Sequence, residues 1–189
     1  MSELALDAAR SALLVMDLQT RVLDNYADGQ EALLAAAAGT IAAARGSGLR
    51  VIYVVAGFRP GFPEISPRNK GFSATRASGF INSDVHPQVA PAPDDIIVTK
   101  HRVGAFTGTD LDMILRSNDI DTLVLSGVST SGVVLSTLRH AADSDYRMLV
   151  LRDCCSDRDR EVHACLLDKV FPRQALVTTS SEMIQALTG

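Results

Sequence analysis

Two ionisable residues, Asp17 and Lys100, each close a short apolar segment of the chain. Asp17 follows Ala-Leu-Leu-Val-Met at residues 12–16, and Lys100 ends the segment that begins at Ile96. An unpaired carboxylate is costly to bury, so Asp17 needs a cation or hydrogen-bond donors there, and Lys100 can be the cation. This pairing would leave Asp17 ready for proton transfer. Alternatively, Asp17 only caps a loop or helix and Lys100 is a solvated strand end.

A glycine-bounded segment, residues 127–132 (Gly-Val-Ser-Thr-Ser-Gly), also follows an apolar run. Its backbone N–H groups could form an anion or oxyanion site, or the segment could be only a tight turn. It matches neither a phosphate-binding loop nor a dinucleotide fingerprint, so we do not expect nucleotide binding. The histidines show no metal-ligand spacing, so we expect no metal and no other cofactor; they are His86, His101, His140 and His163.

Strand-like and helix-like segments alternate along most of the chain. The apolar, β-branched segments predict strands at residues 12–16, 49–55, 96–99, 122–125 and 148–151. Residues 31–45 are rich in alanine and leucine and precede Gly46 and Gly48, which predicts a helix with a glycine end. Further helices are expected after Thr109, from about Ser131 and from Asp159, before a last strand and helix.

This alternation predicts an α/β fold in which a mostly parallel sheet carries helices on both faces, as in Rossmann-like proteins. Ligands of such sheets bind beyond the carboxyl ends of the strands. Asp17, Lys100 and residues 127–132 all follow predicted strands, so we expect them to converge.

Residues 57–93 contain six of the seven prolines and should be mostly loop, with one short helical turn at most. Loops of this length are usually functional, so we expect this one to influence specificity. Three arginines of the loop could contact an anionic substrate, although surface solvation is the commoner role; they are Arg59, Arg68 and Arg76.

The composition is that of an ordinary globular protein, with 47% hydrophobic residues, 21% charged residues and a net charge of −4. It gives no electrostatic indication of nucleic-acid binding, and no apolar stretch approaches the ~20 residues of a membrane span. The N-terminal residues do not read as a secretory signal, which predicts a cytoplasmic location. The length of 189 residues predicts a single domain over 1–189.

Three ordered motifs resemble the isochorismatase-like, or cysteine hydrolase, family: residues 12–19, 98–110 and 127–137. The similarity extends from about Ala12 to the C-terminus. It implies a three-layer sandwich with a six-stranded sheet, assembly into homodimers or larger homo-oligomers, and a small-molecule substrate.

The family's cysteine-dependent members use an Asp, a Lys and a Cys, and the matching positions here are Asp17, Lys100 and Val133. Valine cannot be a nucleophile, which argues against acyl transfer of the nicotinamidase or carbamoylase type. Isochorismatases proper also lack the cysteine and cleave a vinyl ether by protonation and water attack. By resemblance, Asp17 would be the general acid, Lys100 would orient it, and the substrate would meet Gln19, Val128, Ser129, Thr130 and Gly132.

Other interpretations remain open at this level. Because of Val133, the protein could be a catalytically silent subunit that binds a small molecule or serves in assembly. Cys154 or Cys155 could replace the missing thiol, although buried structural cysteines are commoner. Burial raises the pKa of Asp17 and a close Lys100 lowers it, and the sequence does not decide which effect is larger. His163 is expected to be a packed, hydrogen-bonded residue, and His101 to point away from the site.

Overall fold

The computed structural model describes residues 6–26, 29–82 and 84–188, and all strands in these ranges form one parallel sheet. The order across the sheet is β3-β2-β1-β4-β5-β6. The strands are β1 (Ser11–Met16), β2 (Arg50–Ala56), β3 (Ile96–Lys100), β4 (Thr122–Val128), β5 (Arg147–Ser156) and β6 (Leu176–Thr178). The predicted six-stranded α/β fold is confirmed.

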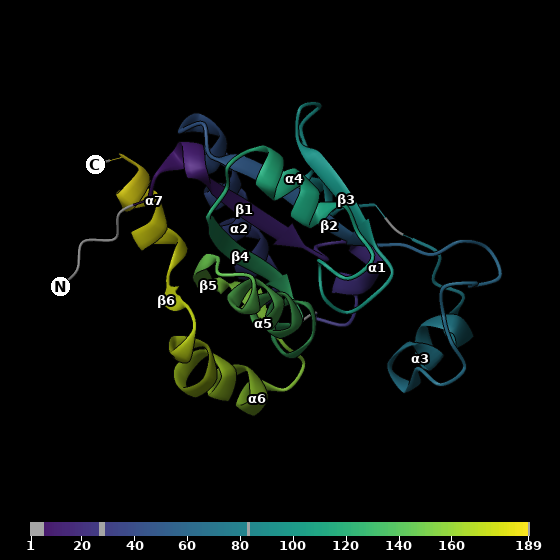
Figure 1. Cartoon of the computed structure of the whole chain (residues 1–189). Helices are drawn as coiled ribbons and strands as arrows, with labels where there is room; N and C mark the ends of the chain where they lie inside the picture. Colours follow the sequence, from purple (N-terminus) through teal and green to yellow (C-terminus); the bar gives the residue numbers. More distant parts are fainter. Residues whose placement is uncertain (1–5, 27–28, 83, 189) are drawn as a thin grey trace.

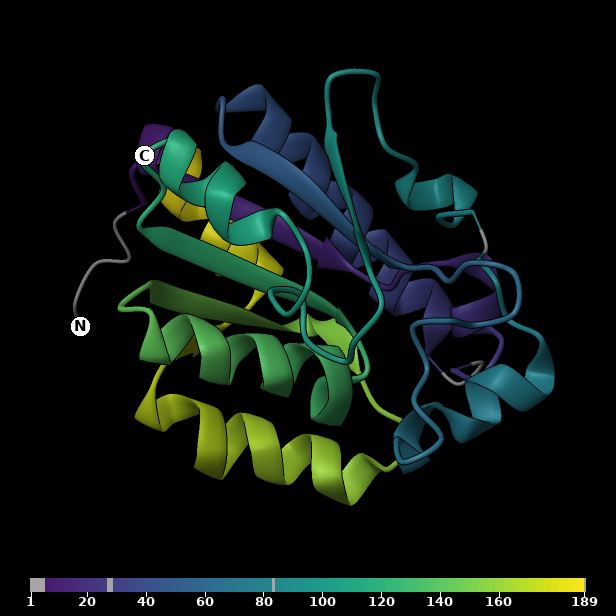
Figure 2. The ribbon, with the colours of Figure 1, turned by 45° about the vertical axis from the view of Figure 1, so that its right-hand side comes forward.

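Helices cover both faces of this sheet (Figures 1 and 2). One face carries α2 (Gln30–Gly46) and α7 (Ser180–Thr188), and the other carries α4 (Leu111–Ser117) and α5 (Leu135–Asp143), with α6 (Arg160–Cys165) beside α5. Two short helices, α1 (Thr20–Leu23) and α3 (Lys70–Ser78), lie beyond the carboxyl ends of the strands. No helix among the described residues combines the length and apolar character that a bilayer crossing requires.

The central strand β1 is buried along its whole length because both of its faces pack against a core. Leu14 and Met16 point into the layer that contains α4 and α5, while Leu13 and Val15 point into the layer that contains α2. Alternate side chains of a strand face opposite sides of the sheet, so a strand covered on both sides is apolar throughout. This explains the uninterrupted apolar run before Asp17.

Several elements differ in extent from the sequence prediction. Strand β5 continues past residue 151 because it bulges: Leu125 of β4 pairs with Val150, whereas Gly127 pairs with Cys155. The helix expected from about Ser131 begins as a π-helical turn, Thr130–Val134, and becomes α-helical only at Leu135. Both irregularities lie at the carboxyl edge of the sheet, where a ligand is expected.

The proline-rich segment contains more helix than predicted. It includes the nine-residue α3 and a 3₁₀ turn, Pro87–Val89. None of the α3 residues is buried, so the helix lacks the regular apolar face by which helices are recognised in a sequence. It ends at Gly79, whose φ of 65° is the left-handed conformation typical of a glycine that terminates a helix.

Candidate functional site

Asp17 and Lys100 form a buried ion pair at the carboxyl edge of the sheet. Asp17 directly follows β1 and Lys100 is the last residue of β3, so the lysine side chain reaches past the end of β2. The Lys100 Nζ lies 2.9 Å from the Asp17 Oδ2, and it also donates to the carbonyl oxygen of Arg102 at 3.0 Å. The two residues are 7% and 4% exposed. The predicted convergence of these strand ends is confirmed.

Burial raises the pKa of Asp17 above its ordinary value, and the neighbouring Lys100 ammonium only partly opposes this effect. The second carboxyl oxygen, Oδ1, is buried and has no hydrogen-bond partner among the described residues. A carboxyl group desolvated in this way favours its protonated form. A raised pKa increases the fraction of Asp17 that carries a proton at a given pH, which is the change that suits a proton donor.

The turn after β4 approaches this pair because Gly127 permits close contact between β4 and β1. Gly127 pairs with Met16 and has a φ of 138°. A Cβ atom at Gly127 would lie 2.1 Å from the Met16 carbonyl oxygen, so no other residue fits without displacement of the backbone. The chain then passes through a cis peptide bond between Val128 and Ser129 and enters the π-helical turn.

Asp17 and Lys100 open onto a cleft of about 650 Å³, which we call the Asp17 cleft. The turn after β4 contributes Val128, Ser129, Gly132 and Val133 to its wall. Val133 itself is 2% exposed. Part of the remaining lining comes from Ala56 and from residues 58–80, which belong to the loop expected to influence specificity. The rest comes from three stretches that sequence reasoning did not assign to the site: α1 and the residues after it, the loop that contains Val103 and the loop that contains Arg158.

Two of the predicted substrate-binding residues hold the walls of the Asp17 cleft and are not among its lining residues. Gln19 is fully buried; its Nε2 donates to the Ala56 carbonyl oxygen at 3.0 Å, and its Oε1 accepts from the Ala56 N–H at 2.7 Å. Thr130 is also fully buried, and its hydroxyl lies 2.8 Å from Nδ1 of His163. Gln19 therefore fixes the end of β2, and Thr130 fixes the turn after β4.

The arginines suggested by the sequence do not lie in the Asp17 cleft. Arg59 pairs with Glu64, with 2.6 Å between Nη1 and Oε1. The cleft is instead lined by Arg21 of α1 and Arg158 of the loop between β5 and α6. The only signal in the sequence that could have found them is their position shortly after β1 and β5.

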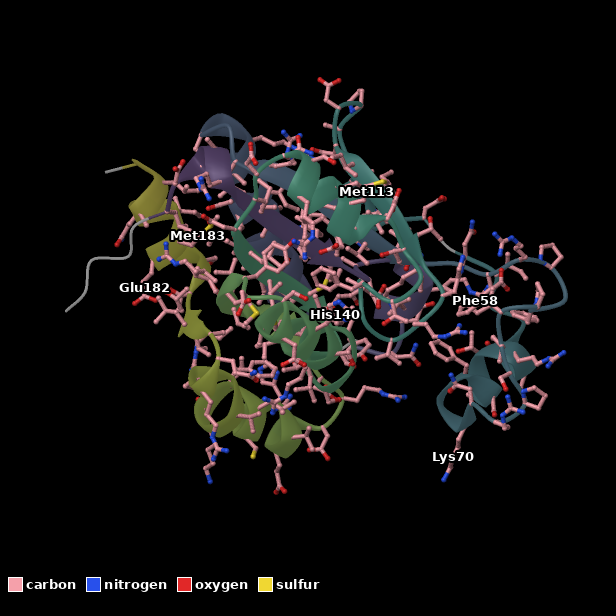
Figure 3. All side chains as sticks on the ribbon, viewed as in Figure 1. Phe58, Lys70, Met113, His140, Glu182 and Met183 are labelled. Atoms are coloured by element: carbon pink, nitrogen blue, oxygen red, sulfur yellow. The ribbon has the colours of Figure 1, made fainter. Side chains whose placement is uncertain are left out.

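Aromatic side chains form part of the wall of the Asp17 cleft. Phe58, labelled in Figure 3, lies where the chain leaves the sheet toward α3. Its ring meets the Phe72 ring edge-on, with centroids 5.6 Å apart. The Arg21 guanidinium lies 5.4 Å from the centroid of the Phe80 ring, within the range of a cation–π contact. The cleft thus combines an apolar wall with the buried acid.

None of the described residues that line the Asp17 cleft is a cysteine or a histidine. Cys154 and Cys155 are buried in the two core layers, and burial raises the pKa of the Cys154 thiol to about 12 and that of Cys155 further. His101 approaches the Gly57 carbonyl oxygen and lines a separate hollow of about 360 Å³. The prediction that His101 points away from the Asp17 cleft is confirmed.

Because Cys154 and Cys155 are buried and their thiols resist ionisation, we expect iodoacetamide to label only Cys165, the exposed cysteine, in the folded protein. Peptide mass spectrometry after a short incubation at neutral pH checks this. A control in urea should label all three. Rapid labelling of Cys154 or Cys155 under native conditions would contradict the placement of these thiols and restore them as candidate nucleophiles.

Within the described ranges, no three side chains of His, Cys, Asp or Glu type come together as a metal-binding group would.

The chain is similar in sequence and in fold to proteins of one family. A model of the isochorismatase domain matches residues 11–182. The uncharacterized isochorismatase family protein YecD of Escherichia coli O157:H7 is 35% identical over 97% of this chain and 100% of its own length. Maleamate amidohydrolase of Pseudomonas putida is 28% identical over 86% of this chain and 78% of its own length. A solved isochorismatase family protein of Burkholderia thailandensis has a TM-score of 0.81 and 28% identity, with full coverage of both chains.

Proposed function

Because the chain belongs to the isochorismatase family of hydrolases, we propose that it hydrolyses a small molecule by acid catalysis from Asp17, without a cysteine nucleophile. The observation that carries this proposal is the state of Asp17. Its carboxyl group is buried, its pKa is raised, and one of its oxygens has no partner among the described residues although the residue lines a cleft. Such a group can keep a proton and present it to a substrate.

Val133 favours hydrolysis by protonation over acyl transfer through a cysteine thiol. It lies in the wall of the Asp17 cleft, at the position where the resemblance places a cysteine, and none of the described lining residues is a cysteine. Covalent acyl transfer through a thiol requires a nucleophile that this wall does not offer. Hydrolysis that begins with protonation does not need one, so we assign the substrate to acid-labile small molecules of the vinyl-ether class.

The proposed reaction begins with proton transfer. Asp17 delivers its proton to the terminal carbon of the vinyl group, and the π electron pair forms the new C–H bond. Water adds to the resulting cation and returns a proton to the Asp17 carboxylate. The hemiketal then breaks its C–O bond while its hydroxyl proton is transferred to the departing alkoxy oxygen, which gives a carbonyl compound and an alcohol. Lys100 stabilises the carboxylate that exists between the two proton transfers.

The test compares the wild-type protein and Asp17→Ala on isochorismate and on a panel of small amides, with products followed by mass spectrometry. We expect turnover of isochorismate or a related enol ether by the wild type alone. Thermal melting of both proteins controls for folding. Amide turnover would overturn the assignment of Val133 to a passive wall, and no turnover of either class would favour the silent subunit.

The same proposal includes a small-molecule substrate, one domain over 1–189, a cytoplasmic location and assembly into a homodimer or larger homo-oligomer. These follow from the composition and from the family resemblance.

A further inference from the structure

Two hydrogen bonds from one segment hold the turn that carries Val133. The Thr130 hydroxyl lies 2.8 Å from Nδ1 of His163, and the Ser131 N–H donates to Oδ2 of Asp157 at 2.7 Å. Asp157 and His163 both belong to the stretch that leaves β5 and enters α6. Gly132 and Val133, the next residues of the turn, line the Asp17 cleft.

We propose that His163 is a positioning residue of this site: through its hydrogen bond with Thr130 it keeps the Thr130–Val134 turn closed, and thereby keeps Val133 buried at the wall that faces Asp17. The inference deepens the proposed function and rests on it for the catalytic importance of that wall. It assigns His163 no contact with the substrate.

The helix that carries His163, α6, is fixed at its start and at its end. The Asp159 carboxylate accepts hydrogen bonds from the backbone N–H groups of Glu161 and Val162 and so caps α6. The backbone N–H of His163 donates to the Asp159 carbonyl oxygen at 2.9 Å. Beyond α6, the chain buries Leu166 and Leu167 in the core. A capped start and a buried continuation fix the imidazole at one turn from the cap, opposite Thr130.

Thr130 depends on this bond more than His163 does. Its hydroxyl is fully buried, and a buried polar group without a partner is destabilising. The His163 ring is only partly buried and borders a second hollow of about 640 Å³, which shares Asp24, Asn25, Tyr26 and Arg158 with the Asp17 cleft. Loss of the imidazole therefore leaves Thr130 without its partner, while loss of the Thr130 hydroxyl leaves His163 accessible to water.

The charged groups around His163 come from several elements. Asp157 and Asp168 favour its protonated form, whereas Arg152 and burial disfavour it, and Arg158, Arg160 and Asp24 line the same hollow. Burial is the largest of these effects and lowers the pKa of His163, which keeps the ring neutral near pH 7. A neutral imidazole can accept at Nδ1 from the Thr130 hydroxyl or donate to it, and either arrangement holds the turn.

The experiment uses a thiol placed on the turn. Val133→Cys is made together with Cys165→Ser, which removes the exposed native cysteine, and the rate of iodoacetamide alkylation at position 133 is measured by peptide mass spectrometry. Since Val133 is 2% exposed, alkylation there reports how often the turn opens. Cys154 and Cys155, both buried in the core, serve in the same sample as internal reporters of global unfolding.

Five proteins are compared: that background without further change, His163→Ala, Thr130→Val, these two changes together, and His163→Asn. We expect His163→Ala and Thr130→Val each to accelerate alkylation at position 133 by about two- to tenfold, the range that loss of one hydrogen bond predicts. Combining them should add little. His163→Asn places an amide atom near the position of Nδ1 and should restore the slow rate. Cys154 and Cys155 should label no faster in any of them.

Three results would overturn the inference: an unchanged rate at position 133, equal acceleration at all three thiols, or a His163→Asn rate as high as that of His163→Ala. The second would indicate general destabilisation, and the third would indicate that the ring acts by packing. Because alkylation needs no substrate and no catalysis by Asp17, its outcome is independent of whether the proposed hydrolysis is found.

Discussion

Replacement of Asp17 by asparagine is expected to lower kcat by about 10²- to 10⁴-fold, the usual contribution of a positioned general acid. Asparagine keeps the shape of the side chain but has no acidic proton to give. The other residues that line the Asp17 cleft are kept in this variant, so KM should change less than kcat. Steady-state kinetics on the enol ether identified by the substrate panel measures both quantities.

Stability must be controlled in that experiment because Asp17 is half of a buried ion pair. Asp17→Asn leaves the Lys100 ammonium with the Arg102 carbonyl oxygen but without its counter-charge. Removing one partner of a buried pair commonly costs about 3–5 kcal/mol. The double variant Asp17→Asn/Lys100→Met removes both charges and should regain much of this stability without regaining turnover. Activity in either variant near the wild-type level would exclude Asp17 as the acid.

Gly127→Ala is expected to reduce the free energy of unfolding by about 3 kcal/mol or more, because it combines a severe steric conflict with a strained backbone conformation. The methyl group would lie 2.1 Å from the Met16 carbonyl oxygen, and the φ of 138° is one that alanine rarely adopts. Relief requires β4 to move away from β1 at the point where the site is built, so ligand binding should weaken as well. Urea denaturation measures the stability loss.

Gly39→Ala is the matched control. Gly39 lies inside α2, has no atom within 4 Å of a built Cβ, and therefore gains the higher helix propensity of alanine. It should stabilise the protein by about 0.5–1 kcal/mol. If Gly39→Ala and Gly127→Ala unfold at the same urea concentration, the close approach of β4 to β1 does not constrain the fold as described.

The part of the site that could be predicted from the sequence is the part that the sheet positions. Asp17 and Lys100 are each one step from a run of apolar residues, and in a parallel sheet the carboxyl ends of strands meet at one edge. The segment 127–132 was located by the same reasoning. These predictions required only strand positions and topology, both of which leave a regular pattern in the sequence.

The rest of the site depends on contacts between segments that are far apart in sequence. Gln19 was expected to face the substrate, yet its amide bonds both backbone groups of Ala56, 37 residues away. Arg158 reaches the Asp17 cleft from the loop that follows the bulged strand β5. Helix α3 has no buried residue and so no apolar period to reveal it. Such features are decided by tertiary packing, which local patterns do not encode.

The pKa of Asp17 is a further property that the sequence alone could not predict. The sequence identifies the two opposing influences, burial and Lys100, but their balance depends on how completely the carboxyl group is desolvated. In the structure the burial effect is the larger, although Lys100 lies only 2.9 Å away. Lys100 therefore holds the carboxyl group in place and lowers its pKa by less than burial raises it.

The most direct test of this account is a titration of the Asp17 carboxyl group by ¹³C NMR, in protein labelled at the aspartate side chains and with Asp17→Asn used to assign the signal. We predict that Asp17 titrates above the ordinary aspartate pKa of 3.8, because burial raises its pKa by more than Lys100 lowers it. A pKa at or below 3.8 would show that Lys100 dominates and that Asp17 is a permanent carboxylate, which would contradict its assignment as the general acid.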